Sequence, residues 1–138
     1  MELDDLRSFF SADKYLTSTG VVIEDAGPGW CRCSLQAGPE HLNAGGAVQG
    51  GAIYTLADSA FAVACNYAHL AAADGRLTVS QSASISYSSP GRPGTVLYAE
   101  ARQVSGGKRT CVFRIDVTDD QGKLIATMTG NGFTIDPA

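Results

Sequence analysis

The chain has 138 residues, of which 44% are hydrophobic and 17% are charged, and its formal net charge is −4. A chain of this length suits one domain with a single core, so we expect one domain over residues 1–138. No basic stripe is present that could neutralise phosphates, which argues against nucleic acid as a partner. The acidic N-terminus lacks the positive and apolar regions of a secretory signal.

The N-terminal third predicts a helical segment followed by two strands. Within residues 1–19, apolar side chains recur at helical spacing, and Gly20 ends the pattern. Residues 21–25 and 30–35 favour two strands, or one broken strand, around a Gly-Pro-Gly turn. A loop rich in Gly and Asn follows over residues 38–48.

Beyond this loop, the hydrophobic period indicates one long helix and then several strands. The helix ends at a turn over residues 73–75, after which the period changes from 3.6 to 2. We expect Val79, Ala83, Ile85 and Tyr87 on one side of the first strand, with serines on the other. The strands predicted are 78–88, 95–104, 109–118 and 123–135. This order predicts an α+β domain whose last four strands form an antiparallel meander.

The cysteine pattern indicates neither a disulfide framework nor a metal site. The chain has no C-x-x-C motif and no His/Cys ligand spacing, so we expect no zinc. We expect reduced, mostly buried thiols of a cytoplasmic protein, and no cofactor. The cysteines are Cys31, Cys33, Cys65 and Cys111.

The long helix has an unusual second face. One face is apolar and suits packing on a sheet; it comprises Ile53, Leu56, Ala57, Ala60, Phe61, Val63, Ala64 and Tyr67. The opposite face lacks Lys, Glu and Arg and holds small side chains, so we expect a second subunit to pack against it. The polar residues of the helix argue against a membrane span. The members of this second face are Thr55, Asp58, Ser59, Ala62, Cys65 and Asn66.

Asp58 is the one charged side chain between Gly50 and Leu70. Burying a charge is costly unless the charge is paired or hydrogen-bonded. Two interpretations remain open from this residue alone. Asp58 is either a hydrogen-bonded carboxylate in an interface, or a catalytic acid, base or nucleophile with a tuned pKa.

The loop before the helix favours the catalytic interpretation. Residues 43–51 deliver the chain to a helix N-terminus, where backbone amides have no intrahelical partner and the macrodipole favours negative charge. Gly50 and Gly51 let a ligand approach the backbone closely. Such amides suit a developing oxyanion. The pattern matches neither of the common nucleotide-phosphate loops.

The stretch "HLNAGGAVQGGAIYTLADSAFAVACN", followed by "ISYSSPGRPG", resembles the hotdog-fold acyl-CoA thioesterases of the PaaI type. The resemblance runs from residue 38 to the C-terminus. It implies a long central helix wrapped by a curved antiparallel sheet, hydrolysis of acyl-CoA thioesters, and dimers or tetramers of dimers. The family's Asn falls on Asn43, the first Gly of its His-Gly-Gly on Gly50, its Asp on Asp58, and a water-placing Ser on Ser80. The family's usual His is Gln49 here, which cannot transfer a proton near neutral pH.

Helix geometry adds a constraint on the site. Asp58 follows Gly50 by eight residues, or about 12 Å along a helix. A nucleophile must come to about 3–3.5 Å from the reacting carbon. If both residues act on one carbonyl, they therefore belong to different subunits, and we expect a homodimer or homotetramer with shared sites.

The expected mechanism follows from these assignments. The amide of Gly50, alone or with Gly51, polarises the thioester carbonyl, and Asn43 orients the loop or binds the carbonyl. Asp58 of the other subunit attacks directly or deprotonates a water. Ser80 either positions this water or belongs to a polar strand face.

Other residues and functions remain alternatives. Arg92, Lys108 and Arg109 either bind the phosphates of CoA or form solvated surface. A non-catalytic acyl-CoA-binding protein is the main alternative function, and a hotdog dehydratase or hydratase has less support because no His lies in the expected site. Three aromatic residues either shape an acyl or aryl pocket or belong to the core: Tyr54, Phe61 and Tyr67.

Overall fold

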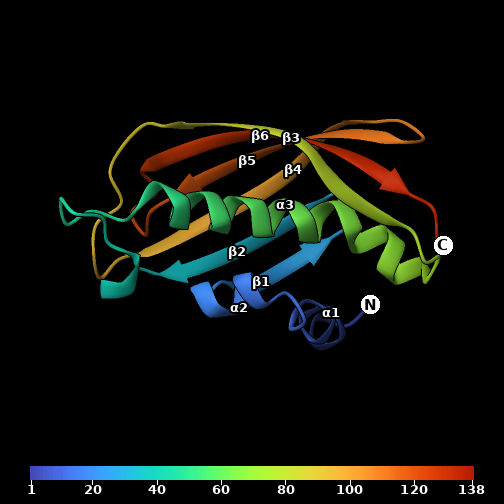
Figure 1. The fold of residues 1–138 in the computed structure, drawn as a ribbon, viewed down its shortest axis with the longest axis horizontal. Helices are drawn as coiled ribbons and strands as arrows, with labels where there is room; N and C mark the ends of the chain where they lie inside the picture. The colour runs from blue at the N-terminus through green and yellow to red at the C-terminus, as the bar shows by residue number, and fades with distance from the viewer.

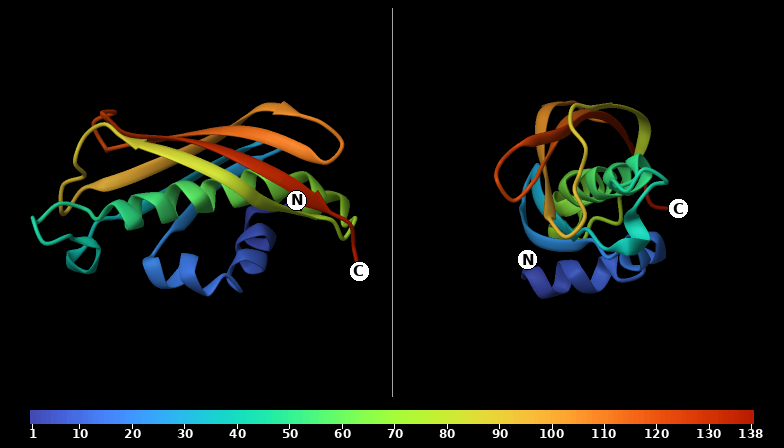
Figure 2. Two further views of the ribbon diagram at one scale, coloured as in Figure 1. Left: turned by 45° about the horizontal axis from the view of Figure 1, so that its top comes forward. Right: turned by 90° about the vertical axis from the view of Figure 1, so that its left-hand side faces the viewer.

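The computed structural model describes residues 1–138, in which a curved antiparallel sheet wraps around one long helix, α3 (Gly50–Ala72) (Figure 1). Two short helices, α1 (Leu3–Phe10) and α2 (Lys14–Thr19), lie on the side of α3 that faces away from the sheet (Figure 2). None of the helices has the length and apolarity needed to cross a membrane.

The sheet has six strands in the order β1-β2-β4-β5-β6-β3, and every neighbouring pair is antiparallel. The predicted four-strand meander is therefore wrong in one connection. β4, β5 and β6 form a meander, but β3 pairs with β6 and not with β4, so β3 is an edge strand. β3 and β4 follow each other in the chain but are not neighbours in the sheet, because β4 pairs with β2. The strands are β1 (Val22–Gly27), β2 (Trp30–Gln36), β3 (Leu77–Tyr87), β4 (Val96–Gly106), β5 (Thr110–Thr118) and β6 (Leu124–Ile135).

The N-terminal segment is helical, as predicted, but it is divided into two helices. The Asp13 side chain caps α2 by accepting from the N–H of Leu16 at 3.0 Å, and Gly20 ends α2 with φ +94°. Arg7 of α1 donates to the carbonyl of Ile23 at 2.8 and 2.6 Å. These bonds partly cover the β1 edge of the sheet.

The apolar face of α3 packs on the sheet as predicted. Phe61 is 1% exposed and its ring centroid lies 5.6 Å from that of Phe113. A Cβ at Gly130 of β6 would lie 3.1 Å from the Phe61 ring, so this glycine allows the helix to approach the sheet closely. Phe61 is thus a core residue, and the suggestion that it shapes a substrate pocket is wrong.

The second face of α3, against which we expect a second subunit to pack, is already partly covered within the chain. Ser59 is 5% exposed, and α1 and α2 pack on this side of the helix (Figure 2). Asn66 is 6% exposed and pairs with β3: its amide donates to the Thr78 carbonyl at 2.9 Å and accepts from the Thr78 N–H at 2.8 Å. Asp58, Ala62 and the rest of this face remain half-buried.

All four cysteines are free thiols. Cys31 and Cys33 are fully buried on one side of β2, with their sulfurs 3.7 Å apart, because residues two apart in a strand share a face. Cys65 and Cys111 are partly buried.

Candidate active site

The loop before α3 is held in shape by Asn43. Its Oδ1 accepts from the N–H groups of Gly45 at 2.9 Å and Ala47 at 3.1 Å. The backbone N–H of Asn43 also donates to the Ala47 carbonyl at 2.7 Å, and Gly46 adopts φ +84°. Asn43 is therefore a loop-forming residue, and its side-chain NH₂ is left free to donate to a ligand.

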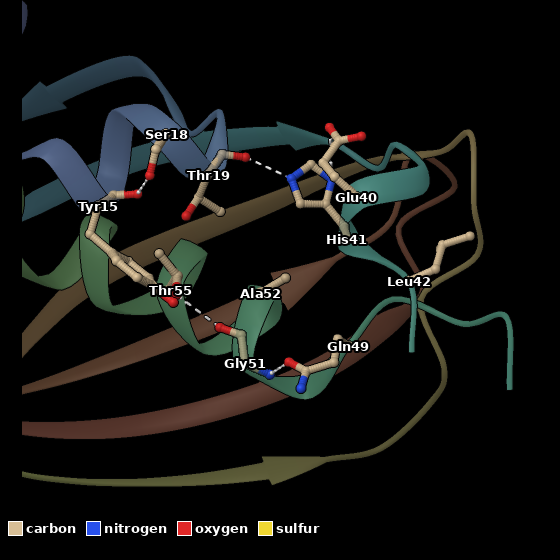
Figure 3. Close-up of a pocket in the computed structure, with 10 residues that line it drawn as sticks. All are labelled: Tyr15, Ser18, Thr19, Glu40, His41, Leu42, Gln49, Gly51, Ala52 and Thr55. Atoms are coloured by element: carbon tan, nitrogen blue, oxygen red, sulfur yellow. Dashed lines mark hydrogen bonds and ion pairs between the residues drawn. The ribbon is translucent and has the colours of Figure 1, made fainter. Parts of the chain in front are cut away.

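The first turn of α3 leaves one amide available. Gln49 is the N-cap, and its Oε1 accepts from the N–H of Gly51 at 2.7 Å (Figure 3). The N–H of Gly50 donates to no group of the chain. The Gln49 side chain thus occupies the Gly51 N–H, which the sequence suggested as a second donor to the thioester carbonyl. The Gly50 N–H remains as the free donor at the positive end of the helix.

Tyr87 holds this helix terminus from the end of β3. Its hydroxyl donates to the Gly50 carbonyl at 2.9 Å. An open cavity of about 330 Å³ lies beside the contact, lined by Asn43, Ile53 and Tyr87, among other residues. Sequence reasoning placed Tyr87 on the strand but assigned it no role at the site. Only the return of β3 along α3 brings the two residues together.

Asp58 lies two helical turns further along and has no hydrogen-bond or ion-pair partner. Burial raises the pKa of the Asp58 carboxyl above its ordinary value, and the Asp13 carboxylate at the start of α2 raises this pKa further. Burial also raises the pKa of Tyr54, to which the charge of Asp58 adds. Asp58 is therefore a poorly hydrated carboxylate without a compensating cation, as one interpretation of the sequence required.

A β-bulge separates Ser80 from the other serines of β3. The register shifts between Ser80 and Ser82, so that Ser80 pairs with the buried Gly132 while Ser82 pairs with Asn131 and accepts from its side chain at 2.9 Å. Directly opposite residues share a face, so Ser80 lies on the helix side of the sheet and the later serines lie on the outer side. The predicted alternation fails at Val79, which is 43% exposed.

Ser80 also lies near Asp58 along the helix axis. The hydrogen bonds between Asn66 and Thr78 place these two residues side by side, and α3 and β3 run antiparallel. Distances along both elements can therefore be counted from this pair. Asp58 is about 12 Å from that level at 1.5 Å per residue, and Ser80 is about 7 Å from it at 3.3 Å per residue. Ser80 is thus within about 5 Å of Asp58 along this axis, on the helix side of the edge strand β3, where it remains exposed.

A larger cavity of about 490 Å³ lies on the other side of the α3 N-terminus, between α2 and the loop (Figure 3). His41, which is 7% exposed, lines it. The His41 Nδ1 accepts from the Gly38 N–H at 3.0 Å, and its Nε2 donates to the Thr19 carbonyl at 2.6 Å. Because both ring nitrogens are bonded to backbone groups, His41 ties the loop to α2 and is a structural residue.

The candidate phosphate ligands lie near opposite ends of α3. Arg92 is exposed beside the site loop, where the N–H of Val48 donates to the Gly91 carbonyl at 2.9 Å. Lys108 and Arg109 lie on the β4–β5 hairpin, near the C-terminal end of α3. Within one chain they cannot meet the same small ligand as Arg92.

The comparisons with known proteins agree with this fold. A family model described as the thioesterase superfamily matches residues 45–126, more than half of the chain. A putative esterase of Archaeoglobus fulgidus is 31% identical over 91% of this chain and 78% of that protein. Acyl-coenzyme A thioesterase PaaI of Escherichia coli is 30% identical over 94% of this chain and 88% of that protein. The chain therefore belongs to the thioesterase superfamily.

Solved structures narrow this class to the PaaI type. The PaaI protein of the phenylacetic acid degradation operon of E. coli superposes with a TM-score of 0.86 at 27% identity, over 96% of this chain and 91% of that chain. The TT0310 protein of Thermus thermophilus gives a TM-score of 0.80 at 32% identity, over 88% and 97%. The α+β hotdog fold predicted from the sequence is confirmed, and the chain is a PaaI-type member of the superfamily.

Proposed function

We propose that this protein hydrolyses acyl-CoA thioesters to a free acid and CoA. Membership of the thioesterase superfamily supports the reaction class, and the E. coli relative is named an acyl-coenzyme A thioesterase. The observation that carries the proposal is the combination of one free helix N-terminal amide, at Gly50, with one unpaired and poorly hydrated carboxylate, at Asp58.

The proposed chemistry assigns one task to each group. The Gly50 N–H donates to the thioester carbonyl oxygen and stabilises the negative charge that develops on it. Asp58 either attacks the carbonyl carbon, giving a mixed anhydride that water then hydrolyses, or removes a proton from an attacking water. Ser80 positions the water, and Asn43 shapes the loop and offers its free NH₂ to the carbonyl. Gln49 contributes by capping the helix.

The separation of Gly50 and Asp58 supports a site shared between two subunits. The two residues are on one helix, about 12 Å apart, so one thioester cannot meet both within one chain. β3 offers the means of association, because it is an edge strand of 11 residues without charge or proline. Such an edge is a template for pairing with another chain. We propose that it pairs antiparallel with β3 of a second copy.

The position of the two-fold axis follows from the same geometry. For Gly50 of one subunit to meet Asp58 of the other, the two-fold axis must pass midway between these residues along α3. That point is the level of Tyr54. Tyr54 is about 18 Å from the Asn66 level along α3, which corresponds to about five or six strand residues beyond Thr78. We therefore expect β3–β3 pairing centred near Ser84. The tetramer implied by the resemblance, the aryl acyl group suggested by the aromatic residues and the cytoplasmic location suggested by the cysteines stay predictions.

Two alternatives have less support. A dehydratase or hydratase needs a histidine at the site, but both nitrogens of His41 are bonded to backbone groups. His69 is paired with Asp74 at 2.8 Å, beyond the far end of α3. A non-catalytic acyl-CoA-binding protein has no need for an unpaired carboxylate, whose burial is costly.

The proposal is tested by thiol release from a panel of aliphatic and aryl acyl-CoA substrates. We expect catalytic CoA release from at least one of them, with acyl identity read from the kcat/KM values. If folded protein binds acyl-CoA but releases no thiol from any member, the non-catalytic alternative is correct and hydrolysis is not the function.

A further inference from the structure

The outer face of the sheet, which points away from α3, is covered by no helix of the chain, because α1, α2 and α3 all lie on the other side (Figure 2). In the middle of this face, charged side chains of β4 and β5 surround a hollow of about 270 Å³ whose lining contains no apolar side chain. The alternate residues of both strands are fully buried under α3, so these charges point outward. They are Glu100, Arg102, Arg114 and Asp116.

The four charges are sorted into two rows that run across the strands. The register places Glu100 directly opposite Asp116, and Arg102 directly opposite Arg114. Like charges in such positions destabilise a sheet, whereas opposite charges would stabilise it. Each arginine instead bonds the acid two residues away on its own strand: Arg102 bonds Glu100, and Arg114 bonds Asp116 at 3.2 Å. The face therefore carries an acidic row (Glu100 and Asp116) and an arginine row (Arg102 and Arg114), about 7 Å apart along the strands.

Aromatic side chains flank the two rows on the β2 side. The Arg102 guanidinium lies 5.8 Å from the ring centroid of Trp30, whose Nε1 donates to Glu100 at 3.2 Å. The Arg32 guanidinium lies 4.4 Å from the ring centroid of Tyr98. Tryptophan, tyrosine and arginine are enriched at the centres of protein interfaces. The composition of the outer face is therefore that of a docking surface.

The charge pattern indicates which partner fits this surface. The charges of the two rows sum to zero, so the rows as a whole attract neither a polyanion nor a polycation. They fit a surface that carries the same two rows in reverse order, and a second copy of this chain supplies one. When the copy is turned by 180° about an axis that lies in the interface and runs across the strands, its arginine row faces the acidic row. An axis along the strands would place each row on its like, which is repulsive.

We propose that two copies of this chain dock through their outer sheet faces, with the arginine row of each on the acidic row of the other. Two sheets that pack face to face lie about 10 Å apart. Side chains as long as arginine and glutamate cross that distance when they extend from both sides. Together with the proposed pairing of β3, this contact gives a tetramer.

The level of the proposed axis agrees with a separate observation. Ser84 lies level with the arginine row and Ser86 lies level with the acidic row, so the midpoint between the rows is the level of Ile85. The β3 pairing derived from Gly50 and Asp58 is centred near Ser84. In a closed assembly of four copies the two-fold axes meet, so both must cross the sheet at one level. The two levels agree to about one residue, or about 3 Å. This agreement rests on the proposed function, whereas the charge rows do not depend on it.

The test reverses one row at a time and measures mass by sedimentation at micromolar concentration. We expect the unaltered protein to sediment as four copies of 14.3 kDa. Arg102→Glu/Arg114→Glu makes both rows acidic, and Glu100→Arg/Asp116→Arg makes both rows basic. We expect a dimer for each variant, a twofold loss of mass, because like rows repel. An equimolar mixture of the two variants should return to the tetramer mass, because an acidic face then meets a basic one.

Arg92→Glu/Lys123→Glu is the matched control, because it makes the same change of charge at two exposed cations in connecting loops. We expect this control to remain a tetramer. A dimer mass for the unaltered protein, a tetramer mass for either row variant, a mixture that stays dimeric, or a control that dissociates would each overturn the proposal.

Arg114→Ala decides the question if a row variant does not fold. The contact that it removes recurs four times in the tetramer, so the tetramer dissociation constant should rise at least about tenfold. An unchanged constant would refute the contact between outer faces. Every readout is a mass, so a failure to hydrolyse thioesters would overturn the proposed function and leave this test unaffected.

Discussion

The two halves of α3 carry polar side chains on the same face, but these side chains differ in whether they have hydrogen-bond partners. In the C-terminal half, Asn66 is buried and pairs with both peptide groups of Thr78. In the N-terminal half, Asp58 has no partner and its pKa is raised by burial, and the Gly50 N–H is free beside a cavity. A paired polar group fixes the fold, whereas an unpaired one that the fold tolerates is available for chemistry.

The largest effect is expected from removing the Gly50 N–H. Gly50→Pro deletes that donor at the first helical position, where proline fits, and the preceding Gln49 already has the extended conformation that proline requires. We expect kcat to fall about 10²–10³-fold, the effect of losing one oxyanion donor. Gly50→Ala is the control, because it adds a Cβ at the same 3.3 Å from the Tyr87 ring but keeps the N–H. A similar loss in both variants would point to crowding and not to the amide.

Asp58→Asn should lower kcat by at least about 10²-fold while leaving the protein folded. Stability should respond in the opposite direction. Because burial raises the pKa of Asp58, the folded state binds more protons than the unfolded state between the ordinary and the raised pKa. The unaltered protein therefore loses stability as pH rises through that window, and the variant does not. We expect a thermal midpoint at neutral pH equal to or above that of the unaltered protein; a lower midpoint would make Asp58 a structural residue.

Asn66→Ala should show the reverse behaviour. The change leaves the N–H and carbonyl of Thr78 without partners, and we expect a loss of about 2–4 kcal/mol in the free energy of unfolding. The kcat per folded molecule should stay near its original value. Ser59→Ala is the control on the same helix face, since the Ser59 hydroxyl donates only to the Thr55 carbonyl one turn earlier. Denaturant unfolding and active-fraction kinetics on one preparation separate the two quantities.

A smaller effect is expected at Tyr87. Tyr87→Phe removes the hydroxyl that donates to the Gly50 carbonyl but keeps the ring against the loop. Loss of one neutral hydrogen bond costs about 0.5–1.5 kcal/mol, so kcat should fall about 2- to 10-fold with little change in KM. An unchanged kcat would show that the helix terminus is positioned without Tyr87.

The sequence predicted most of the helix and strand positions because their hydrophobic periods are regular. It also predicted the burial of the apolar helix face and the isolation of Asp58. It could not predict that β3 pairs with β6, since pairing partners depend on how the sheet closes around α3. The bulge after Ser80 was also missed, because "SQSASIS" alternates without a break and no glycine marks the shift.

For the candidate site, the sequence suggested individual residues but not how they are arranged. Gln49 was recognised as a departure from the family pattern, and only the structure shows that its side chain occupies the Gly51 amide. Tyr87 was missed because its contact with Gly50 joins residues 37 positions apart. The sequence analysis considered the cationic residues together as candidate ligands of the CoA phosphates, whereas the fold places Arg92 and Lys108 at opposite ends of α3.

The central claim is that Asp58 and Gly50 of different subunits act on one thioester, and subunit mixing tests it directly. The Asp58→Asn and Gly50→Pro proteins are each expected to keep at most about 1% of the original kcat as homodimers. After unfolding and refolding together, half of the dimers are hybrids, and each hybrid has one intact and one doubly altered site. We predict recovery of up to about one quarter of the original kcat per subunit. If the mixture shows hybrids by mass but no more activity than the separate variants, the two residues do not share a site across the interface.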